Sequence, residues 1–373
     1  MEEARNDGRL ASLDALRGLD MLMIAALPPL LAALIGGVFG CGDCWFLKSV
    51  GRHANWAGFN IRDTIFPLFM FISGVAYPYS YAKRVERGDS TRSILLKILW
   101  RTLALVLLGI VYGGFFTTVF AKGFAAVRYP SVLARIGIAW GAAACLYVFC
   151  RRRTRIAVAA AILVGYWAIL YFVAAPGSAP GVDTFSPDGC FACWLDRHIW
   201  PNGSADPEGF LSTFPAIVTT MGGVFAGELV RSERFSGGRK TLILLGASLA
   251  CGLAAWAWSP WCPIVKKLWT STFVLAAWSY SLAFFALFYW LVDVMMWRRW
   301  TFFFRVVGMN SILIYFLQKK DLIDFHVPAK FFFHGFASWV GGPWTGVIDA
   351  VAYLLMLWLV LFLFYKKKVF LRV

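Results

Sequence analysis

Residues 59–82 read FNIRDTIFPLFMFISGVAYPYSYA, an apolar stretch whose charged residues, Arg62 and Asp63, lie at its beginning. A helix of about 20 apolar residues spans the ~30 Å hydrocarbon core of a bilayer. Similar blocks recur along the chain, and we expect further membrane helices over residues 13–39, 93–120, 131–149, 156–174, 210–230, 242–258, 268–294, 302–318 and 347–365. The sequence therefore predicts an all-α fold, a polytopic membrane bundle of about ten transmembrane helices.

The composition agrees with this class. Of 373 residues, 60% are hydrophobic and only 15% are charged, and the mean hydropathy is +0.67. Soluble domains are roughly 45–50% apolar and about 25% charged. These values exclude a soluble enzyme, a nucleic-acid-binding protein and a disordered tail. Because no shift in composition marks a boundary, we expect a single transmembrane domain over residues 1–373.

The net charge of +16 is distributed unevenly. About two thirds of the 36 Lys and Arg residues lie on the side of the N-terminus, the bias that the positive-inside rule gives to cytoplasmic loops. The basic connections are residues 83–87, 151–155, 231–240, 297–299 and 366–368. We therefore predict that the N- and C-termini are both cytoplasmic, and that the lipid bilayer rather than nucleic acid explains the basic charge.

The opposite side has the longer connections, which contain all four histidines and two C-x-x-C pairs, Cys41/Cys44 and Cys190/Cys193. Disulfides are the usual fate of such cysteines outside the cytoplasm, and four cysteines allow three connectivities. A zinc site that includes His198 and a thiol relay coupled to a membrane quinone are alternatives. We expect no bound metal, and the cysteine pairing stays open.

Residues 52–74 place His53 just outside a predicted span, Asp63 in its first turn and Pro67 one turn further on. Ionisable groups at membrane depth usually face a wet cavity or a partner. Histidine, with an unperturbed pKa near 6.5, is suited to act as a general base at about neutral pH. The alternative is an interfacial histidine and a carboxylate that stabilises a helix N-terminus.

Two other segments place polar groups at or within spans. Asp206-Pro207-Glu208-Gly209 brings two carboxylates to the beginning of the sixth span, although the same residues are ordinary in turns. Gly308-Met309-Asn310-Ser311 places an amide and a hydroxyl inside the ninth span, where polar side chains also link helices structurally. Each segment alone is a weak functional signal.

Taken together with SLDALRGL at residues 12–19 and KKLWTST at residues 266–272, these segments resemble the heparan-alpha-glucosaminide N-acetyltransferase family and its bacterial relatives. The resemblance covers nearly the whole chain, and its most specific part is HANWAGFNIRD at residues 53–63. It implies a membrane enzyme that moves an acetyl group from cytoplasmic acetyl-CoA to the amino group of a glucosamine-type sugar or glycan on the outer side. A bacterial inner membrane is the implied location.

The resemblance places His53 at the family's catalytic histidine. The family also has an active-site asparagine after the first span, but residues 27–51 contain none, so Asn55 or Asn60 would have to supply it. Coenzyme A carries phosphates, which basic side chains bind. The expected catalytic residues are His53, Asp63 and Asn55, those for acetyl-CoA are Arg17, Lys83, Arg84, Arg101, Arg305 and Asn310, and those for the acceptor sugar are Trp56, Asp206, Glu208, Lys266 and Lys267.

Two other functions remain open at this stage. A secondary transporter of a sugar or amino sugar also has about ten helices with interrupted spans and buried polar groups. A membrane thiol oxidoreductase would use the two C-x-x-C pairs. Glycine pairs such as Gly36-Gly37 permit close helix packing, either within one subunit or in a homodimer.

Overall fold

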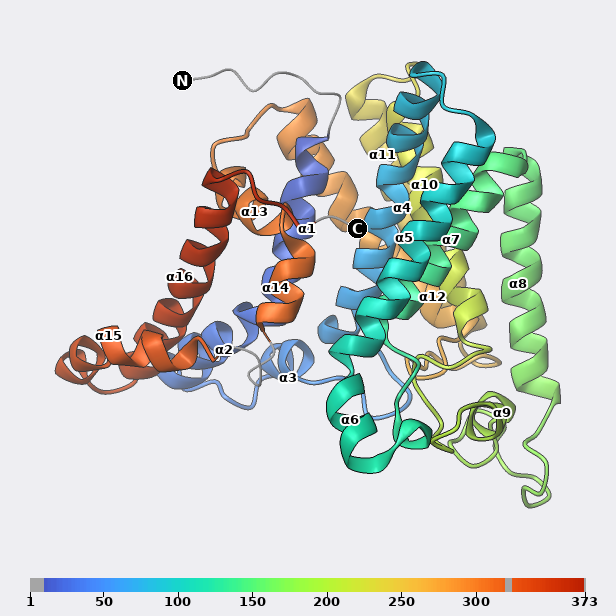
Figure 1. Cartoon of the computed structure of the whole chain (residues 1–373), viewed down its shortest axis with the longest axis horizontal. Coiled ribbons are helices and arrows are strands. Elements are labelled where there is room, and N and C mark those ends of the chain that lie inside the picture. Colours follow the sequence, from blue (N-terminus) through green and yellow to red (C-terminus); the bar gives the residue numbers. More distant parts are fainter. Residues whose placement is uncertain (1–9, 319–323, 372–373) are drawn as a thin grey trace. The chain divides into compact units, whose positions relative to one another are not determined.

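The computed structural model describes residues 10–318 and 324–371, and the regular structure of these residues is helical (Figure 1). The only β contacts among them are two isolated bridges, Ala57 with Val265 and Ala174 with Cys190. The all-α membrane fold is thereby confirmed. The chain forms two compact units, which are described separately.

Unit 1 comprises the described residues within 1–54, 60–65 and 284–372. Its helices are α1 (Ala11–Ala25), α2 (Leu27–Leu31), the π-helix η1 (Ala32–Val38), α3 (Trp45–Gly51), the π-helix η3 (Tyr289–Val294), α13 (Thr301–Gly308), α14 (Ser311–Leu317), α15 (His326–Val340) and α16 (Trp344–Lys366). The first turn of α4 (Ile61–Glu86) also belongs to it. Helix α1 packs against α13, and α15 packs against α16.

Unit 2 comprises residues 55–59 and 66–283. It contains the rest of α4 and then α5 (Thr91–Tyr112), α6 (Phe115–Lys122), the short η2 (Phe124–Ala126), α7 (Val132–Phe149), α8 (Arg152–Phe172), α9 (Phe191–Ile199), α10 (Thr213–Arg231), α11 (Gly237–Trp258) and most of α12 (Ser271–Phe288). Helix α7 packs against α5 and α10. Helices α4 and α10 cross closely, since a Cβ on Gly223 would lie 1.9 Å from the carbonyl oxygen of Phe71.

Among the described residues, eight helices are long and apolar enough to span a membrane, with α12 and η3 forming one of them. A ninth candidate is the pair formed by α1 and residues Leu27–Val38, which is bent by 66°. The prediction of one continuous helix over residues 13–39 was therefore wrong. Pro28 and Pro29 explain the bend, because two adjacent prolines lack the backbone N–H groups that would continue α1 and are accommodated in the first turn of a new helix, α2.

Two other predicted spans differ from the structure. The helix expected over residues 93–120 ends at Tyr112, and Gly114 then adopts a left-handed conformation with φ of 85° before α6 begins. The helix expected over residues 302–318 is broken into α13 and α14. At the break, the Asn310 side chain donates to the carbonyl oxygen of Val369 at 3.3 Å and accepts from the backbone N–H of Leu371 at 3.1 Å.

The helices of unit 2 alternate in direction, so its basic connections gather at one end and its long loops at the other (Figure 1). At the basic end, Arg155 at the start of α8 binds Glu228 near the end of α10 at 2.6 Å. At the opposite end, loop contacts join Trp56 to Phe185 and Arg128 to Asp206. This segregation matches the charge pattern, while the orientation in a membrane stays a prediction.

Candidate active site

Asp63 connects the beginning of α4 to the preceding loop. Its Oδ2 accepts from the backbone N–H of Asn60 at 3.0 Å and from that of Ala54 at 3.1 Å. Asn60 is the N-cap of α4, and Asp63 is the third residue of the helix, so the first of these bonds is half of a capping box. The backbone of this segment therefore orients the Asp63 carboxylate, whose side chain is fully buried.

The other carboxylate oxygen of Asp63 lies 2.7 Å from Nδ1 of His53. A carboxylate can only accept, so Nδ1 carries the proton in neutral histidine, and Nε2 has the lone pair. The His53 side chain is 51% exposed, whereas Asp63 is inaccessible. The pair therefore has the geometry of a general base whose ring is oriented by a buried carboxylate.

Three further hydrogen bonds hold the backbone on either side of His53. Ser49 Oγ accepts from the N–H of Ile61 at 2.8 Å, and Asn60 Nδ2 donates to the carbonyl oxygen of Arg52 at 3.1 Å. Arg62 donates to the carbonyl oxygen of Gly51 at 3.0 Å. Of the two asparagines considered for the family's amide role, Asn60 thus contacts the residue before His53, whereas the Asn55 side chain is exposed.

In unit 2, Trp56 and Lys267 are brought together. The Trp56 indole N–H donates to the carbonyl oxygen of Phe185 at 2.7 Å, and Lys267 Nζ lies 5.4 Å from the indole ring centre. The N–H of Gly58 donates to the carbonyl oxygen of Ile264 at 2.8 Å, which attaches the loop after His53 to the segment before α12. Lys266 is half-buried in that same segment.

A second cluster in unit 2 contains Asp206 and Glu208. The Arg128 guanidinium binds the carboxylates of both residues. Its Nε donates to Asp206 Oδ2 at 2.5 Å, and its Nη2 donates to Asp206 Oδ1 at 2.8 Å and to Glu208 Oε2 at 2.5 Å. Burial opposes ionisation of Asp206, but the hydrogen bonds and charge of Arg128, together with hydrogen bonds from Glu208, outweigh it and hold the pKa of that carboxyl below its usual range. Burial raises the pKa of Glu208. The two carboxyls therefore differ in their affinity for a proton.

Arg135, in the first turn of α7, contacts the same turn from inside the bundle. Its Nη2 donates to the carbonyl oxygen of Gly209 at 3.2 Å and to Ser212 Oγ. Its guanidinium carbon lies 5.0 Å from the centre of the buried Trp269 ring. The sequence analysis did not select Arg128 or Arg135. For Arg135 the available signal was an arginine within an apolar span, which usually has a specific partner, whereas Arg128 lies in a connection and had no such signal.

Helix α9 is another feature that the sequence analysis did not anticipate, since residues 176–209 were expected to be a connection. Its buried Asp196 accepts from the backbone N–H of Phe210 at 2.8 Å. A Cβ on Gly209 would lie 1.7 Å from Asp196 Oδ2, so glycine is required for this approach. Burial raises the pKa of Asp196 to about 6. Asp196 thereby positions the turn that carries Glu208.

The residues expected to bind acetyl-CoA are divided between the two units. In unit 1, Arg17 lies 3.3 Å from Asp14, Arg305 is half-buried in α13, and Asn310 is fully buried with its amide bonded to the backbone of the C-terminal segment. In unit 2, the Arg101 guanidinium lies 4.2 Å from the Trp140 ring centre. Lys83 and Arg84 occupy the last turn of α4.

The motif residues in unit 1 also have a packing role. A Cβ on Gly18 would lie 1.9 Å from the carbonyl oxygen of Phe304, and one on Gly308 would lie 2.2 Å from that of Asp14. Both glycines therefore permit the close approach of α1 and α13. This observation gives SLDALRGL and Gly308-Met309-Asn310-Ser311 a structural explanation that does not depend on a ligand.

Within residues 10–318 and 324–371, no three His, Cys, Asp or Glu side chains gather as metal ligands. His198, the histidine considered for a zinc site, donates through Nδ1 to the carbonyl oxygen of Trp194 at 2.8 Å. Its ring lies 4.2 Å from that of Trp194. These contacts hold the His198 ring against Trp194 of the same helix.

The chain is similar to two curated proteins of mammals. It is 26% identical over 363 residues to heparan-alpha-glucosaminide N-acetyltransferase of Homo sapiens, a match that covers 82% of this chain and 52% of the human protein. The enzyme of the same name from Mus musculus is 26% identical over 365 residues, with 82% and 53% covered. The chain thus spans about half the length of the curated relatives it matches.

No family model matches the sequence. The similarity to the human and mouse proteins extends over most of the chain, and both carry the name of the family that the motifs suggested. The resemblance to the heparan-alpha-glucosaminide N-acetyltransferases predicted from the motifs is therefore confirmed at the level of a distant family relationship.

Proposed function

We propose that the chain is a multi-pass membrane acetyltransferase that uses acetyl-CoA and acetylates the amino group of a glucosamine-type sugar. The observation that carries this proposal is the 2.7 Å contact between His53 Nδ1 and buried Asp63, with the ring half-exposed. The similarity to N-acetyltransferases supports the reaction class over a transporter or a thiol oxidoreductase. We place the protein in a bacterial inner membrane, with His53 on the outer side.

The chemistry assigned to His53 follows from what acetyl transfer requires. A sugar ammonium must lose a proton before its nitrogen attacks the thioester carbon, and the C–S bond then breaks as the C–N bond forms. His53 Nε2 can take that proton, which leaves an imidazolium stabilised by Asp63. In the alternative route, Nε2 attacks the thioester carbon and coenzyme A leaves as its thiolate. The amine then attacks the acetyl carbon on Nε2 and the imidazole leaves.

We assign the nucleotide end of acetyl-CoA to the basic end of unit 2. Arg101 stacks on Trp140, whose ring is 5.6 Å from that of Tyr77, and Tyr81 packs against Tyr147 at 5.2 Å. Lys83 and Arg84 follow Tyr81 in α4, and Arg155 lies 4.6 Å from the centre of the Tyr147 ring. Aromatic faces and guanidinium groups together suit a base and phosphates.

We assign the acceptor sugar to the opposite end of unit 2. The Trp56 ring offers an apolar face for a sugar, and Asp206 and Glu208 offer acceptors for hydroxyl and ammonium groups. Arg128 holds both carboxylates in place. Lys267, beside Trp56, is a donor for sugar oxygens.

The test uses the full chain in lipid nanodiscs with radiolabelled acetyl-CoA and glucosamine. Wild type should form labelled N-acetylglucosamine, and His53→Ala should reduce turnover by at least about 100-fold, the usual value of acid–base catalysis. His198→Ala is the matched control, because His198 also lies in a long loop but contacts only its own helix in the contacts described above. Equal turnover by His53→Ala and wild type would refute the assignment of His53.

A further inference from the structure

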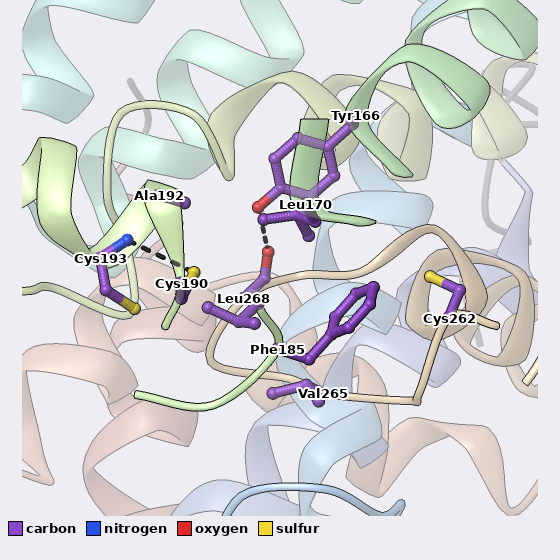
Figure 2. Packing of buried hydrophobic residues seen from close by; sticks show 9 residues of the cluster. All are labelled: Tyr166, Leu170, Phe185, Cys190, Ala192, Cys193, Cys262, Val265 and Leu268. Atoms are coloured by element: carbon purple, nitrogen blue, oxygen red, sulfur yellow. Dashed lines mark hydrogen bonds between the residues drawn. The ribbon is translucent and has the colours of Figure 1, made fainter. Parts of the chain in front are cut away.

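The first turn of α9 begins with a cysteine pair. Cys190 is the N-cap residue, and its sulfur accepts from the backbone N–H of Cys193 at 3.4 Å (Figure 2). The two thiols lie against one hydrophobic cluster, whose other buried members are Tyr166, Leu170, Phe185, Ala192, Cys262, Val265 and Leu268. The C-x-x-C spacing therefore brings both sulfurs to the same helix end.

The two sulfurs are chemically unequal. A hydrogen bond from the Cys193 thiol holds the pKa of Cys190 below its usual value, against the effect of burial, and backbone N–H groups add to this effect. The same contact, together with burial, raises the pKa of Cys193. A cysteine at a helix N-terminus in a C-x-x-C pair commonly ionises first and attacks first.

We propose that Cys190 and Cys193 form a disulfide across the first turn of α9, and that this modification stabilises the beginning of the helix. The oxidant is a disulfide, either of a thiol oxidase or of a small oxidised thiol. Before α9 packs against this cluster, the Cys190 thiolate attacks one sulfur of the oxidant, which forms a mixed disulfide and releases the first thiol. The Cys193 thiolate then attacks the Cys190 sulfur and releases the second, so two electrons and two protons end on the oxidant.

Burial decides what kind of disulfide this is. Cys190 is 1% exposed and Cys193 is 7% exposed, so a thiol reductant has little access to the bond once the helix is packed. Disulfides that exchange during turnover need an accessible attacking sulfur. The Cys190–Cys193 bond is therefore structural.

The bond would stabilise a segment that contacts the loop of Trp56 on one side and the turn that carries Glu208 on the other. Just before the pair, the N–H of Ala175 donates to the carbonyl oxygen of Gly189 at 2.9 Å, and Phe185 accepts from Trp56. Just after it, Asp196 accepts from the N–H of Phe210. The inference goes beyond the proposed function and does not require it, because the chemical state of two cysteines is measured without acetyl transfer.

The experiment blocks thiols in acid-quenched membranes with N-ethylmaleimide under denaturing conditions, then reduces the protein and adds a second label. Cys190 and Cys193 should take only the second label, and the unreduced peptide containing both should be lighter by two hydrogen atoms. Cys145 and Cys251, which lie within helices, should take the first label. First-label modification of both Cys190 and Cys193, or a peptide that links either of them to Cys262, would overturn the proposal.

A pair of variants tests the structural role. Cys193→Ser should leave Cys190 reactive with the first label and lower the thermal unfolding temperature in detergent, whereas Cys251→Ser should leave both unchanged. If Cys193→Ser does not fold, the labelling of wild type still decides whether the bond exists. An unfolding temperature of Cys193→Ser equal to that of wild type would show that the bond does not fasten α9.

Discussion

The His53–Asp63 pair and the Arg128–Asp206–Glu208 cluster both contain a buried carboxylate in or beside a loop, yet they differ in charge balance and access. Asp63 receives hydrogen bonds from two backbone N–H groups and from one histidine whose side chain is 51% exposed. Asp206 and Glu208 share one arginine, which is itself 48% exposed, while their own side chains are 4% and 11% exposed.

This difference separates two kinds of site. A neutral, accessible ring held by a buried carboxylate can gain and lose a proton while the backbone around it stays fixed. A cluster in which two buried carboxyl groups share one guanidinium loses stability when that guanidinium is removed. We therefore expect changes at the first site to affect turnover and changes at the second to affect folding as well as sugar binding.

The membrane topology is the first test of this comparison, because it decides on which side of the membrane the carboxylate cluster lies. If the basic connections are cytoplasmic, a reporter fused after Arg153 should be active only in the cytoplasm, and one fused near Gly203 should be active only outside it. The Gly203 fusion lies in the loop that carries Asp206. Two reporters on the same side would contradict the alternation of α8 with its neighbours and the outer location of the carboxylate cluster.

Asp63→Asn should have the largest effect on turnover among changes that keep His53. The amide keeps the shape of the side chain but cannot stabilise an imidazolium, so turnover should fall by about 10- to 100-fold, less than for His53→Ala. The capping bonds to Asn60 and Ala54 need only an oxygen acceptor, so the unfolding temperature should change little. A large loss of stability with normal turnover would assign Asp63 a purely structural role.

Arg128→Met should mainly affect stability. It leaves two buried carboxylates without their shared cation, a loss we put at about 1–3 kcal/mol because the guanidinium is half-exposed and water replaces part of the interaction. Arg151→Met is the control, since Arg151 is an exposed residue in a basic connection. Denaturation in detergent would measure both, and equal stability would show that the cluster is not a closed network.

Much of the architecture followed from local sequence. The apolar blocks located the membrane helices, because an apolar segment in lipid must satisfy its backbone hydrogen bonds internally and therefore forms a helix. His53 and Asp63 flank one helix start, so the sequence permitted their contact but did not require it. The bend at Pro28 had a local signal, two adjacent prolines, which we interpreted as part of one span. The break at Asn310 was missed because it reflects how that amide bonds to the C-terminal segment, which a single span does not encode.

The second cluster shows the limit of sequence reasoning. Arg128 and Glu208 are far apart in the chain, and nothing local in either loop indicates their contact. Helix α9 was not predicted, because a short amphipathic helix inside a long connection lacks the apolar block of about 20 residues by which we recognised the spans. The C-x-x-C pair marked its position, but only the structure shows that Cys190 begins a helix.

The last prediction concerns Asp196, and its effect depends on pH. Burial raises the pKa of Asp196 from 3.8 to about 6 in the folded protein, so the folded state holds a proton that the unfolded chain has already lost. The contribution of this group to stability should therefore be greatest below pH 4. It should fall as the pH rises from about 4 to about 6, by roughly 3 kcal/mol.

Asp206 opposes this trend, since its pKa is lowered and its contribution is lost as the pH falls below about 4. Asp196→Asn separates the two effects, because the amide oxygen can still accept from the N–H of Phe210 but no longer titrates. Its unfolding temperature, measured in detergent, should lose the decline between pH 4 and pH 6 while keeping the loss at lower pH. An unchanged decline in Asp196→Asn would assign the titration to another group, of which Glu208, with its raised pKa, is the nearest in the chain.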